Sequence, residues 1–272
     1  MPELPEVETT RRGIAPHVEG KKVERVIVRH GKLRRPVPSD LLRELPGRTI
    51  GRVERRGKYL LLRTDGGSVI LHLGMSGHLA IVPSATPPEK HDHLDICLTD
   101  GMTLRLTDPR RFGLALWTRE EPLLHPLLAE IGPEPLEEGF DGAYLFRASR
   151  GRTVAVKQFI MDGRMVAGVG NIYASEALFR AGIHPGKKAG TMSMERCRRL
   201  ARAIRAVLGE AIEAGGTTLR VFQDVAGKPG YFALRLAVYG RAGEPCPRCG
   251  APVRSTRQGG RSTYFCGGCQ KR

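Results

Sequence analysis

Four cysteines near the C-terminus have the spacing of a metal site. Two residues separate Cys246 from Cys249, and two separate Cys266 from Cys269, which gives the pattern C-x2-C-x16-C-x2-C. Four thiolates at this spacing suit a tetrahedral zinc ion, with each pair on a tight turn. Paired disulfides and a redox C-x-x-C fit less well, because the chain has two such pairs and no thioredoxin-like βαβ pattern. We expect one structural zinc ion, since four cysteines leave no open coordination position for catalysis.

The N-terminal segment MPELPEVETTRRG is the second candidate for chemistry. It places two prolines and three glutamates in the first eight residues of a chain whose net charge is +16. One interpretation is structural: residues 5–17 form a helix, with Pro5 in its first turn and Glu6 and Glu8 near its positive dipole end. The other interpretation is that this terminus takes part in a reaction.

The positive charge lies in one half of the chain. Residues 1–142 hold 21 basic and 21 acidic side chains, whereas residues 143–272 hold 23 basic and 7 acidic ones. Such a balance indicates a polyanionic partner, because released counterions drive binding to phosphates. A basic protein without a nucleic-acid partner is the alternative, and the asymmetry between the halves favours a dedicated binding surface.

The elements that must hold these residues change along the chain. Strand-like alternation at 23–30 and two hairpin patterns with Asp-Gly turns predict an antiparallel β-sandwich in the first half. An acidic Pro/Gly-rich stretch follows, and apolar spacing of i, i+3, i+4, i+7 then predicts a helix from Ser193 to Gly215. The fold class is therefore α+β. The expected division is a catalytic β-sandwich domain at 1–131, a linker at 132–142, a helical domain at 143–239 and a zinc finger at 240–272.

The residues between the two cysteine pairs, GAPVRSTRQGGRSTYF, have strand-forming ends and a basic tip. They predict a β-hairpin held by zinc, with Arg257 and Arg261 presented outward.

The N-terminal segment, the internal segment GVGNIYASEALF and the four-cysteine finger stand in one chain in this order. Together they resemble the bacterial formamidopyrimidine-DNA glycosylases, bifunctional enzymes that remove 8-oxoguanine and ring-opened purines. The resemblance covers essentially the whole chain. It implies a two-domain clamp on DNA, whose helical part contains a helix-two-turns-helix element.

The resemblance implies that Pro2 is the nucleophile once Met1 is removed. A terminal α-amino group has a pKa near 8, so much of it is unprotonated near neutral pH. It can attack the sugar C1′ and form an iminium, which acidifies the C2′ proton and leads to strand cleavage by β,δ-elimination. Glu3 is then the general acid/base that assists sugar-ring opening, Glu6 orients the site, and Glu176 lies near the extruded nucleotide.

The resemblance also implies contacts with the DNA phosphates. Lys58, at the start of a strand, reaches the phosphate beside the damaged sugar, and Arg261 binds the lesion phosphate and promotes the second elimination. Asn171 follows a Gly-rich turn at a helix start, where backbone N–H groups favour anions. His91 and Arg152 match further DNA-contact positions.

Extruding a base leaves a gap in the duplex and costs a few kcal/mol of unstacking. The resemblance implies that Met75, Arg110 and Phe112 fill this gap. The segment GKPGYF at 227–232 matches a loop that closes over the extruded base.

Two other functions compete with an oxidised-purine glycosylase and lyase. An endonuclease VIII-like enzyme for oxidised pyrimidines is disfavoured by the intact Met/Arg/Phe set, and a non-catalytic zinc-finger DNA-binding protein by the retention of Pro2, Glu3 and Lys58. The expected partner is double-stranded DNA that contains oxidised purines. We expect a cytoplasmic, nucleoid-associated monomer without membrane contact and without a redox or nucleotide cofactor.

Overall fold

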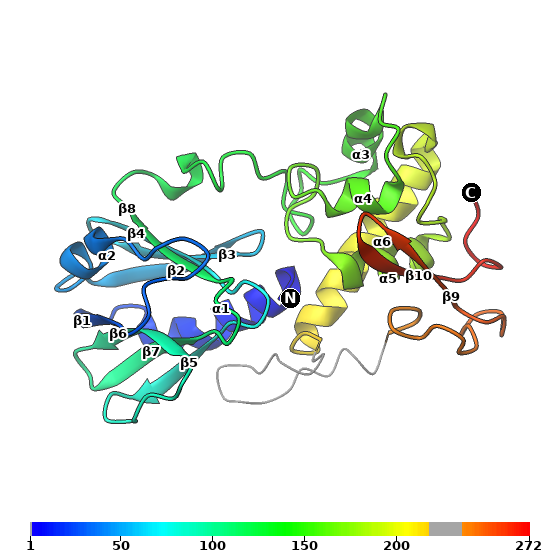
Figure 1. Cartoon of the computed structure of the whole chain (residues 1–272). Helices are drawn as coiled ribbons and strands as arrows, with labels where there is room; N and C mark the ends of the chain where they lie inside the picture. The colour runs from blue at the N-terminus through cyan, green and yellow to red at the C-terminus, as the bar shows by residue number, and fades with distance from the viewer. Residues whose placement is uncertain (1, 218–235) are drawn as a thin grey trace. The chain divides into compact units, whose positions relative to one another are not determined.

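The structure is a computed structural model that describes residues 2–217 and 236–272. Its chain divides into two compact units (Figure 1). The first unit contains Met1–Glu130 and Ala214–Tyr231, and the second contains Ile131–Glu213 and Phe232–Arg272. The chain therefore passes between the units more than once, and a single continuous boundary does not describe it.

Two four-stranded antiparallel sheets form the first unit. One sheet has the strand order β1-β6-β7-β5 and the other has the order β2-β3-β4-β8. The strands are β1 Val23–Val28, β2 Ile50–Arg56, β3 Tyr59–Thr64, β4 Gly67–His72, β5 His78–Pro83, β6 Asp92–Leu98, β7 Met102–Thr107 and β8 Leu114–Thr118. The expected sandwich and both expected hairpins, β3–β4 and β6–β7, are confirmed.

Apolar side chains from both sheets pack between them in one buried cluster, which includes Leu60, Leu71, Ile96 and Leu104. Helix α1 (Leu4–Val18) packs against the edge strands β2 and β5 and covers one open side. The short helix α2 (Ser39–Glu44) packs against the opposite edge strands, β1 and β8. The helices thus shield sheet edges that would otherwise expose unpaired backbone groups.

A buried ion network lies on the β1-β6-β7-β5 sheet. Arg105 of β7 pairs with Asp95 of β6 through two nitrogens at 2.9 Å, and only 6% and 3% of their side chains are exposed. Arg29 reaches the same carboxylate at 2.6 Å. Burial raises the pKa of Asp95, but hydrogen bonds from Arg105 and Arg29 outweigh burial and hold this pKa below its usual value.

Arg105 also donates to the carbonyls of Thr86 and Pro87. The network therefore fastens the β5–β6 connection, which ends at His91, onto the sheet.

Helices form most of the second unit. The α-helices are α3 Gly142–Ser149, α4 Val156–Met161, α5 Asn171–Ala181 and α6 Met194–Glu213. The helix expected from Ser193 is thus present as α6, and its apolar stripe is buried from Cys197 to Ile212. Within residues 2–217 and 236–272, no helix is both long and apolar enough to cross a membrane.

The expected C-terminal hairpin is present as strands β9 (Arg254–Gln258) and β10 (Arg261–Phe265). Phe179 of α5 shares an apolar cluster with Val253, Cys246 and Cys266, so the hairpin module packs on α5.

The buried Arg105–Asp95 pair yields a stability prediction. We expect Arg105→Ala to destabilise the first unit by about 3–5 kcal/mol, because it leaves a buried carboxylate without its main partner. Trp117 of β8 is the one tryptophan of the chain, so denaturant unfolding followed by its fluorescence reports on this unit.

The control is Lys21→Ala. Lys21 also pairs with a carboxylate of the first unit, that of Asp100 at 3.0 Å, but 42% and 32% of their side chains are exposed. We expect the control to shift the unfolding midpoint little. Equal shifts for the two variants would show that burial does not set the strength of the Arg105 pair.

Candidate functional site

The four expected zinc ligands converge in the second unit. Their sulfur atoms all lie within 4.8 Å of one another, with 3.5 Å between Cys249 and Cys266 and 3.8 Å between Cys246 and Cys269. Zinc–sulfur bonds of about 2.3 Å in a tetrahedron place sulfur atoms about 3.8 Å apart. The four residues fit one structural zinc ion, which they would hold with no position left for substrate.

Each cysteine pair lies on a turn that the backbone closes. The Gly250 N–H donates to the Cys246 carbonyl, and the Gln270 N–H donates to the Cys266 carbonyl. The Gln270 side chain accepts from the Cys266 N–H and donates to the Ile183 carbonyl, just past α5. These bonds fix the zinc ligands and connect them to the helical unit.

The catalytic residues expected at the N-terminus lie directly before and within the first turn of α1. Pro2, Glu3 and Glu6 are all buried. One Glu6 oxygen accepts from the Glu3 N–H at 2.8 Å, and the other accepts from the Thr217 N–H at 2.7 Å. Gly216 has φ +85°, and a Cβ there would lie 3.2 Å from the Glu6 side chain. Glu6 thus joins the start of α1 to the chain segment that returns to the first unit.

Lys58 lies in the two-residue turn between β2 and β3, one residue earlier than the strand start expected from the sequence. Arg55 donates to the Gly57 carbonyl at 3.1 Å and to Glu8 of α1 at 3.2 Å. Burial raises the pKa of Glu8, but hydrogen bonds from Arg11 and Arg12 lower it below its usual value. An ionised Glu8 therefore ties the Lys58 turn to the helix that begins beside Pro2.

His72, at the end of β4, is neutral at physiological pH. Burial, with the positive charges of Arg34 and Lys58, lowers the pKa of His72 to about 4. Its Nδ1 accepts a hydrogen bond from the Gly74 N–H at 2.9 Å, which requires the unprotonated ring. His72 thus orients the chain just before Met75.

The three expected gap-filling residues occur on two loops at the ends of strands. Met75 is 40% exposed and Phe112 is 44% exposed, so both side chains are accessible from the surface. The Arg110 guanidinium lies 4.9 Å from the centre of the Phe112 ring. His91, partly buried, lies directly before β6, and its carbonyl accepts from the Asp108 N–H.

Asn171 and the Arg261 strand are brought together in the second unit by Lys157. This lysine of α4 is 1% exposed, and its ammonium donates to Asn171 Oδ1 at 2.6 Å, to the Thr263 hydroxyl at 2.7 Å and to the Ser262 carbonyl at 3.1 Å. The Asn171 amide also donates to the Ser262 carbonyl.

Arg261 begins β10, and its side chain is exposed beside a hollow of about 200 Å³. Lys157 is not among the residues expected from the sequence. It is a single lysine in the apolar run VAVKQFI, a pattern that hints at a buried lysine but does not identify its partners.

Glu176 lies on α5, is 2% exposed and has both carboxylate oxygens engaged. They accept hydrogen bonds from the N–H groups of Ala237, Val238 and Tyr239 at 2.8–2.9 Å. In the described residues Glu176 therefore anchors the backbone that leads into the zinc module. Arg152 is exposed in the connection between α3 and α4.

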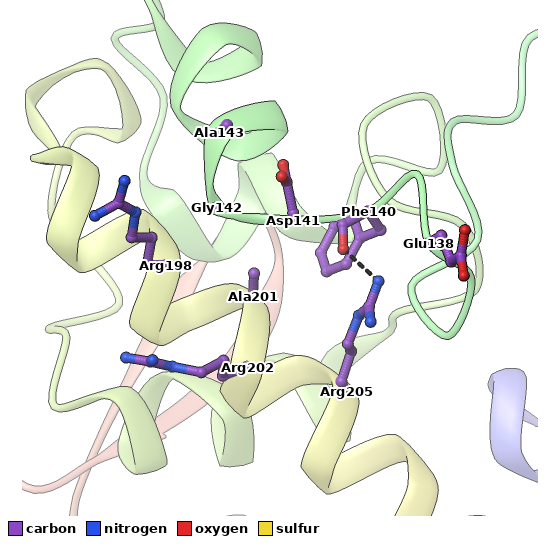
Figure 2. A pocket seen from close by; sticks show the side chains of 9 residues that line it. All are labelled: Glu138, Phe140, Asp141, Gly142, Ala143, Arg198, Ala201, Arg202 and Arg205. Atoms are coloured by element: carbon purple, nitrogen blue, oxygen red, sulfur yellow. Dashed lines mark hydrogen bonds between the residues drawn. The ribbon is translucent and has the colours of Figure 1, made fainter.

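A larger hollow of about 460 Å³ lies between α6 and the start of α3 (Figure 2). Arg198 and Arg202 line it, and Arg205 donates to the carbonyl of Phe140 (Figure 2). Arg205 also donates to the carbonyl of Glu137. None of the side chains expected to act on DNA line this hollow. The loop expected at 227–232 lies outside the described residues.

Removal of the zinc ligands yields a second prediction. We expect the intact protein to carry one zinc ion per chain by metal analysis. In Cys249→Ser, the hairpin should lose its anchor and misplace Arg261, so affinity for duplex DNA falls while Trp117 reports an unchanged sandwich. Freshly purified, reduced protein without zinc would contradict this account, as would a variant that binds DNA normally.

Three family models match almost the whole chain. The formamidopyrimidine-DNA glycosylase N-terminal domain matches residues 1–115, and the H2TH domain of the same enzymes matches residues 131–223. A zinc finger described as found in FPG and IleRS matches residues 243–272.

Full-length relatives and solved structures agree with these matches. The formamidopyrimidine-DNA glycosylase of Geotalea uraniireducens (strain Rf4) is 61% identical over 99% of this chain and 100% of its own length. The MutM (Fpg) crystal structure from Thermus thermophilus is 42% identical, with a TM-score of 0.89 over 99% of this chain and 98% of that one.

A variant of the Lactococcus lactis Fpg, solved in complex with DNA that contains Fapy-dG, is 35% identical with a TM-score of 0.93 over the full length of both chains. The sandwich, the helical unit and the four-cysteine module thus occur here in the same order as in one enzyme family, and their sequences are similar to those of its members. The chain belongs to the formamidopyrimidine-DNA glycosylase family.

Proposed function

We propose that this protein is a DNA glycosylase and AP lyase of base excision repair, which extrudes and removes 8-oxoguanine and formamidopyrimidines from double-stranded DNA. The observation that carries the proposal is the N-terminus. Pro2 directly precedes a helix whose first turn buries Glu3 and Glu6, and the Glu8–Arg55 link ties this helix to the Lys58 turn. A DNA-binding protein without catalysis has no need of this arrangement.

The reaction begins with the terminal amine of Pro2, free after removal of Met1. Its nitrogen forms a bond to C1′ as the bond from C1′ to the damaged base breaks, and the base leaves with the electron pair. The Pro2 nitrogen loses its proton, which the departing base takes up. Glu3 then protonates the ring oxygen O4′, the bond from C1′ to O4′ breaks, and an iminium forms between C1′ and Pro2. Loss of a C2′ proton expels the 3′-phosphate, and loss of the C4′ proton in a second elimination expels the 5′-phosphate.

The remaining residues hold the substrate. Lys58 binds the phosphate beside the damaged sugar, while Asn171 and Arg261 bind the lesion phosphate and His91 and Arg152 contact the backbone nearby. Lys157 bonds both to Asn171 and to the strand that Arg261 begins, which supports the proposal that Asn171 and Arg261 bind the same phosphate. Glu176 acts near the extruded nucleotide through the backbone that it anchors.

Met75, Arg110 and Phe112 fill the gap left by the base, and their exposure on adjoining loops supports this role. In sequence, the functional domains follow the division 1–131, 132–142, 143–239 and 240–272, although the segment that begins at Ala214 belongs to the first compact unit in space. The enzyme acts as a monomer in the cytoplasm, on the nucleoid.

The nucleophile can be tested with a variant that keeps one residue before Pro2, verified by intact mass. An amide nitrogen cannot attack C1′, so borohydride should trap no covalent complex with 8-oxoguanine duplex. The same variant should bind undamaged duplex as the native protein does. Pro2→Gly, which retains a terminal amine, serves as a matched control and should still be trapped. Full trapping by the blocked variant would refute the role of Pro2.

A further prediction concerns the base opposite the lesion. The Arg110 guanidinium only donates hydrogen bonds, and a widowed cytosine offers O2 and N3 as acceptors, whereas adenine presents N1 beside an amino donor. A good bidentate contact discriminates by about 1–3 kcal/mol, or about tenfold to a hundredfold in rate. We expect single-turnover excision to favour lesions opposite C over A, and Arg110→Ala to remove this preference.

Phe112→Ala is the control, because it should slow excision opposite both bases without changing their ratio. If Arg110→Ala keeps the full preference for C, another residue reads the opposite base.

A further inference from the structure

Asp108 joins the two loops that carry the gap-filling residues. The Met75 loop (residues 73–77) connects β4 to β5, and the Arg110 loop (residues 108–113) connects β7 to β8. Each loop therefore crosses from one sheet of the sandwich to the other. Asp108 is fully buried, and within the part of the chain that the structure describes the hydrogen-bond donors to its carboxylate all come from these two loops.

One oxygen of Asp108 accepts from the Ser76 hydroxyl at 2.8 Å and from the Arg110 N–H at 3.3 Å. The other oxygen accepts from the Gly113 N–H at 2.7 Å. The Ser76 hydroxyl in turn accepts from the Arg110 N–H at 3.2 Å. Ser76 and Asp108 thus bond to each other across the loops, and both bond to the residue whose side chain is expected to read the opposite base.

The backbones of the two loops are also in close contact. Gly74 has φ +64°, and a Cβ there would lie 2.3 Å from the Phe112 carbonyl carbon and 2.4 Å from the Gly113 nitrogen. A Cβ atom does not come this close to atoms to which it is not bonded, so only glycine fits at position 74. With this contact, one loop cannot shift without the other.

The Arg110 loop has a conformation that needs support. Arg111 has φ +57°, a region that costs a side-chain-bearing residue energy and persists only where surrounding bonds hold it. The Arg111 N–H donates to the Asp108 carbonyl, and that carbonyl oxygen also lies 2.9 Å from Nε2 of His93. Asp108 thus supports the strained turn through its backbone and connects it to the other loop through its side chain.

We infer that Asp108, through Ser76, is a positioning residue that couples the two loops, so that Met75, Arg110 and Phe112 enter the duplex as one preorganised unit. The inference rests on the proposed gap-filling role of these three side chains. Asp108 itself, being fully buried, touches no DNA. Its effect is to fix where Arg110 and Phe112 stand relative to Met75 before DNA binds, so that no ordering of the loops is needed at the moment of extrusion.

The test uses Ser76→Ala and Asp108→Asn in the full-length, zinc-loaded protein. Ser76→Ala removes the bond between the loops and leaves Asp108 its two backbone donors. Asp108→Asn keeps the shape of the side chain but replaces one oxygen by an NH2 group. Because each carboxylate oxygen accepts a hydrogen bond from a backbone N–H, this NH2 group must face an N–H donor. Ser84→Ala is the matched control, because it removes a hydroxyl bonded to Thr103 at 2.8 Å, away from the two loops.

Two readouts separate loop coupling from a general loss of folded protein. The first is the ratio of single-turnover excision rates for 8-oxoguanine opposite C and opposite A, which does not depend on the active fraction. The second is the fluorescence rise of a 2-aminopurine beside a tetrahydrofuran abasic analogue, measured per bound protein, which reports unstacking by the inserted side chains.

Loss of one hydrogen bond to a charged group should lower the C-over-A ratio about tenfold in Ser76→Ala. We expect Asp108→Asn to lower it at least as much, both variants to reduce the fluorescence rise, and Ser84→Ala to change neither readout. The inference is overturned if both Ser76→Ala and Asp108→Asn retain the native ratio and the native fluorescence rise.

Truncation of the gap-filling side chains distinguishes failure of the inference from failure of the proposed function. If Met75→Ala and Phe112→Ala lower the fluorescence rise but Ser76→Ala and Asp108→Asn do not, the gap-filling role stands and the coupling is wrong. If the truncations leave the fluorescence rise unchanged, the gap-filling role fails and the coupling inference fails with it.

Discussion

A buried carboxylate needs hydrogen-bond donors, and in this protein each of three buried carboxylates takes at least one donor from a segment distant in the sequence. Glu6 joins the N-cap of α1 to Thr217, Asp108 joins the Met75 and Arg110 loops, and Glu176 holds the N–H groups of residues 237–239. Each carboxylate fixes a segment that carries or adjoins residues expected to act on DNA. Since removing any one of them leaves several buried N–H groups unpaired, these joints determine how the functional segments are placed.

In the second unit a buried cation, the Lys157 ammonium, connects segments that are distant in the sequence. The Lys157 ammonium donates hydrogen bonds to the Asn171 side chain, the Ser262 carbonyl and the Thr263 hydroxyl. The four cysteines form the other fixed point of the hairpin, at the opposite end from Arg261. The hairpin that carries Arg261, the arginine proposed to bind the lesion phosphate, is therefore held by the cysteine cluster at one end and by a buried lysine along β10.

Local patterns in the sequence predicted most elements of the fold. The Asp-Gly turns marked the β3–β4 and β6–β7 hairpins, the apolar stripe marked α6, and the cysteine spacing marked the zinc module. These features depend on residues close together in the chain, which is why they can be read from it. The return of the chain to the first unit at Ala214 carried no such signal, since it depends on contacts with residues two hundred positions away.

The candidate site was less predictable for the same reason. The exposed residues Met75, Arg110 and Phe112 could be named, but not the buried Asp108 that connects their loops. The pair Asp108-Pro109 only indicates a turn, which is an ordinary place for an aspartate. Lys157 and Glu176 were likewise ambiguous, because a charged residue in a helix is more often exposed than buried. Their burial results from packing between elements, which no local pattern specifies.

Attack of the Pro2 terminal amine on the sugar is the step on which the proposed reaction depends. The most direct measurement is peptide mass mapping of the borohydride-reduced complex between the native protein and an 8-oxoguanine duplex, after digestion of both protein and DNA. The account predicts that the sugar remnant is attached to the nitrogen of Pro2, in the N-terminal peptide that ends at Arg11. A remnant attached to Lys58, Lys157 or any other lysine would contradict it.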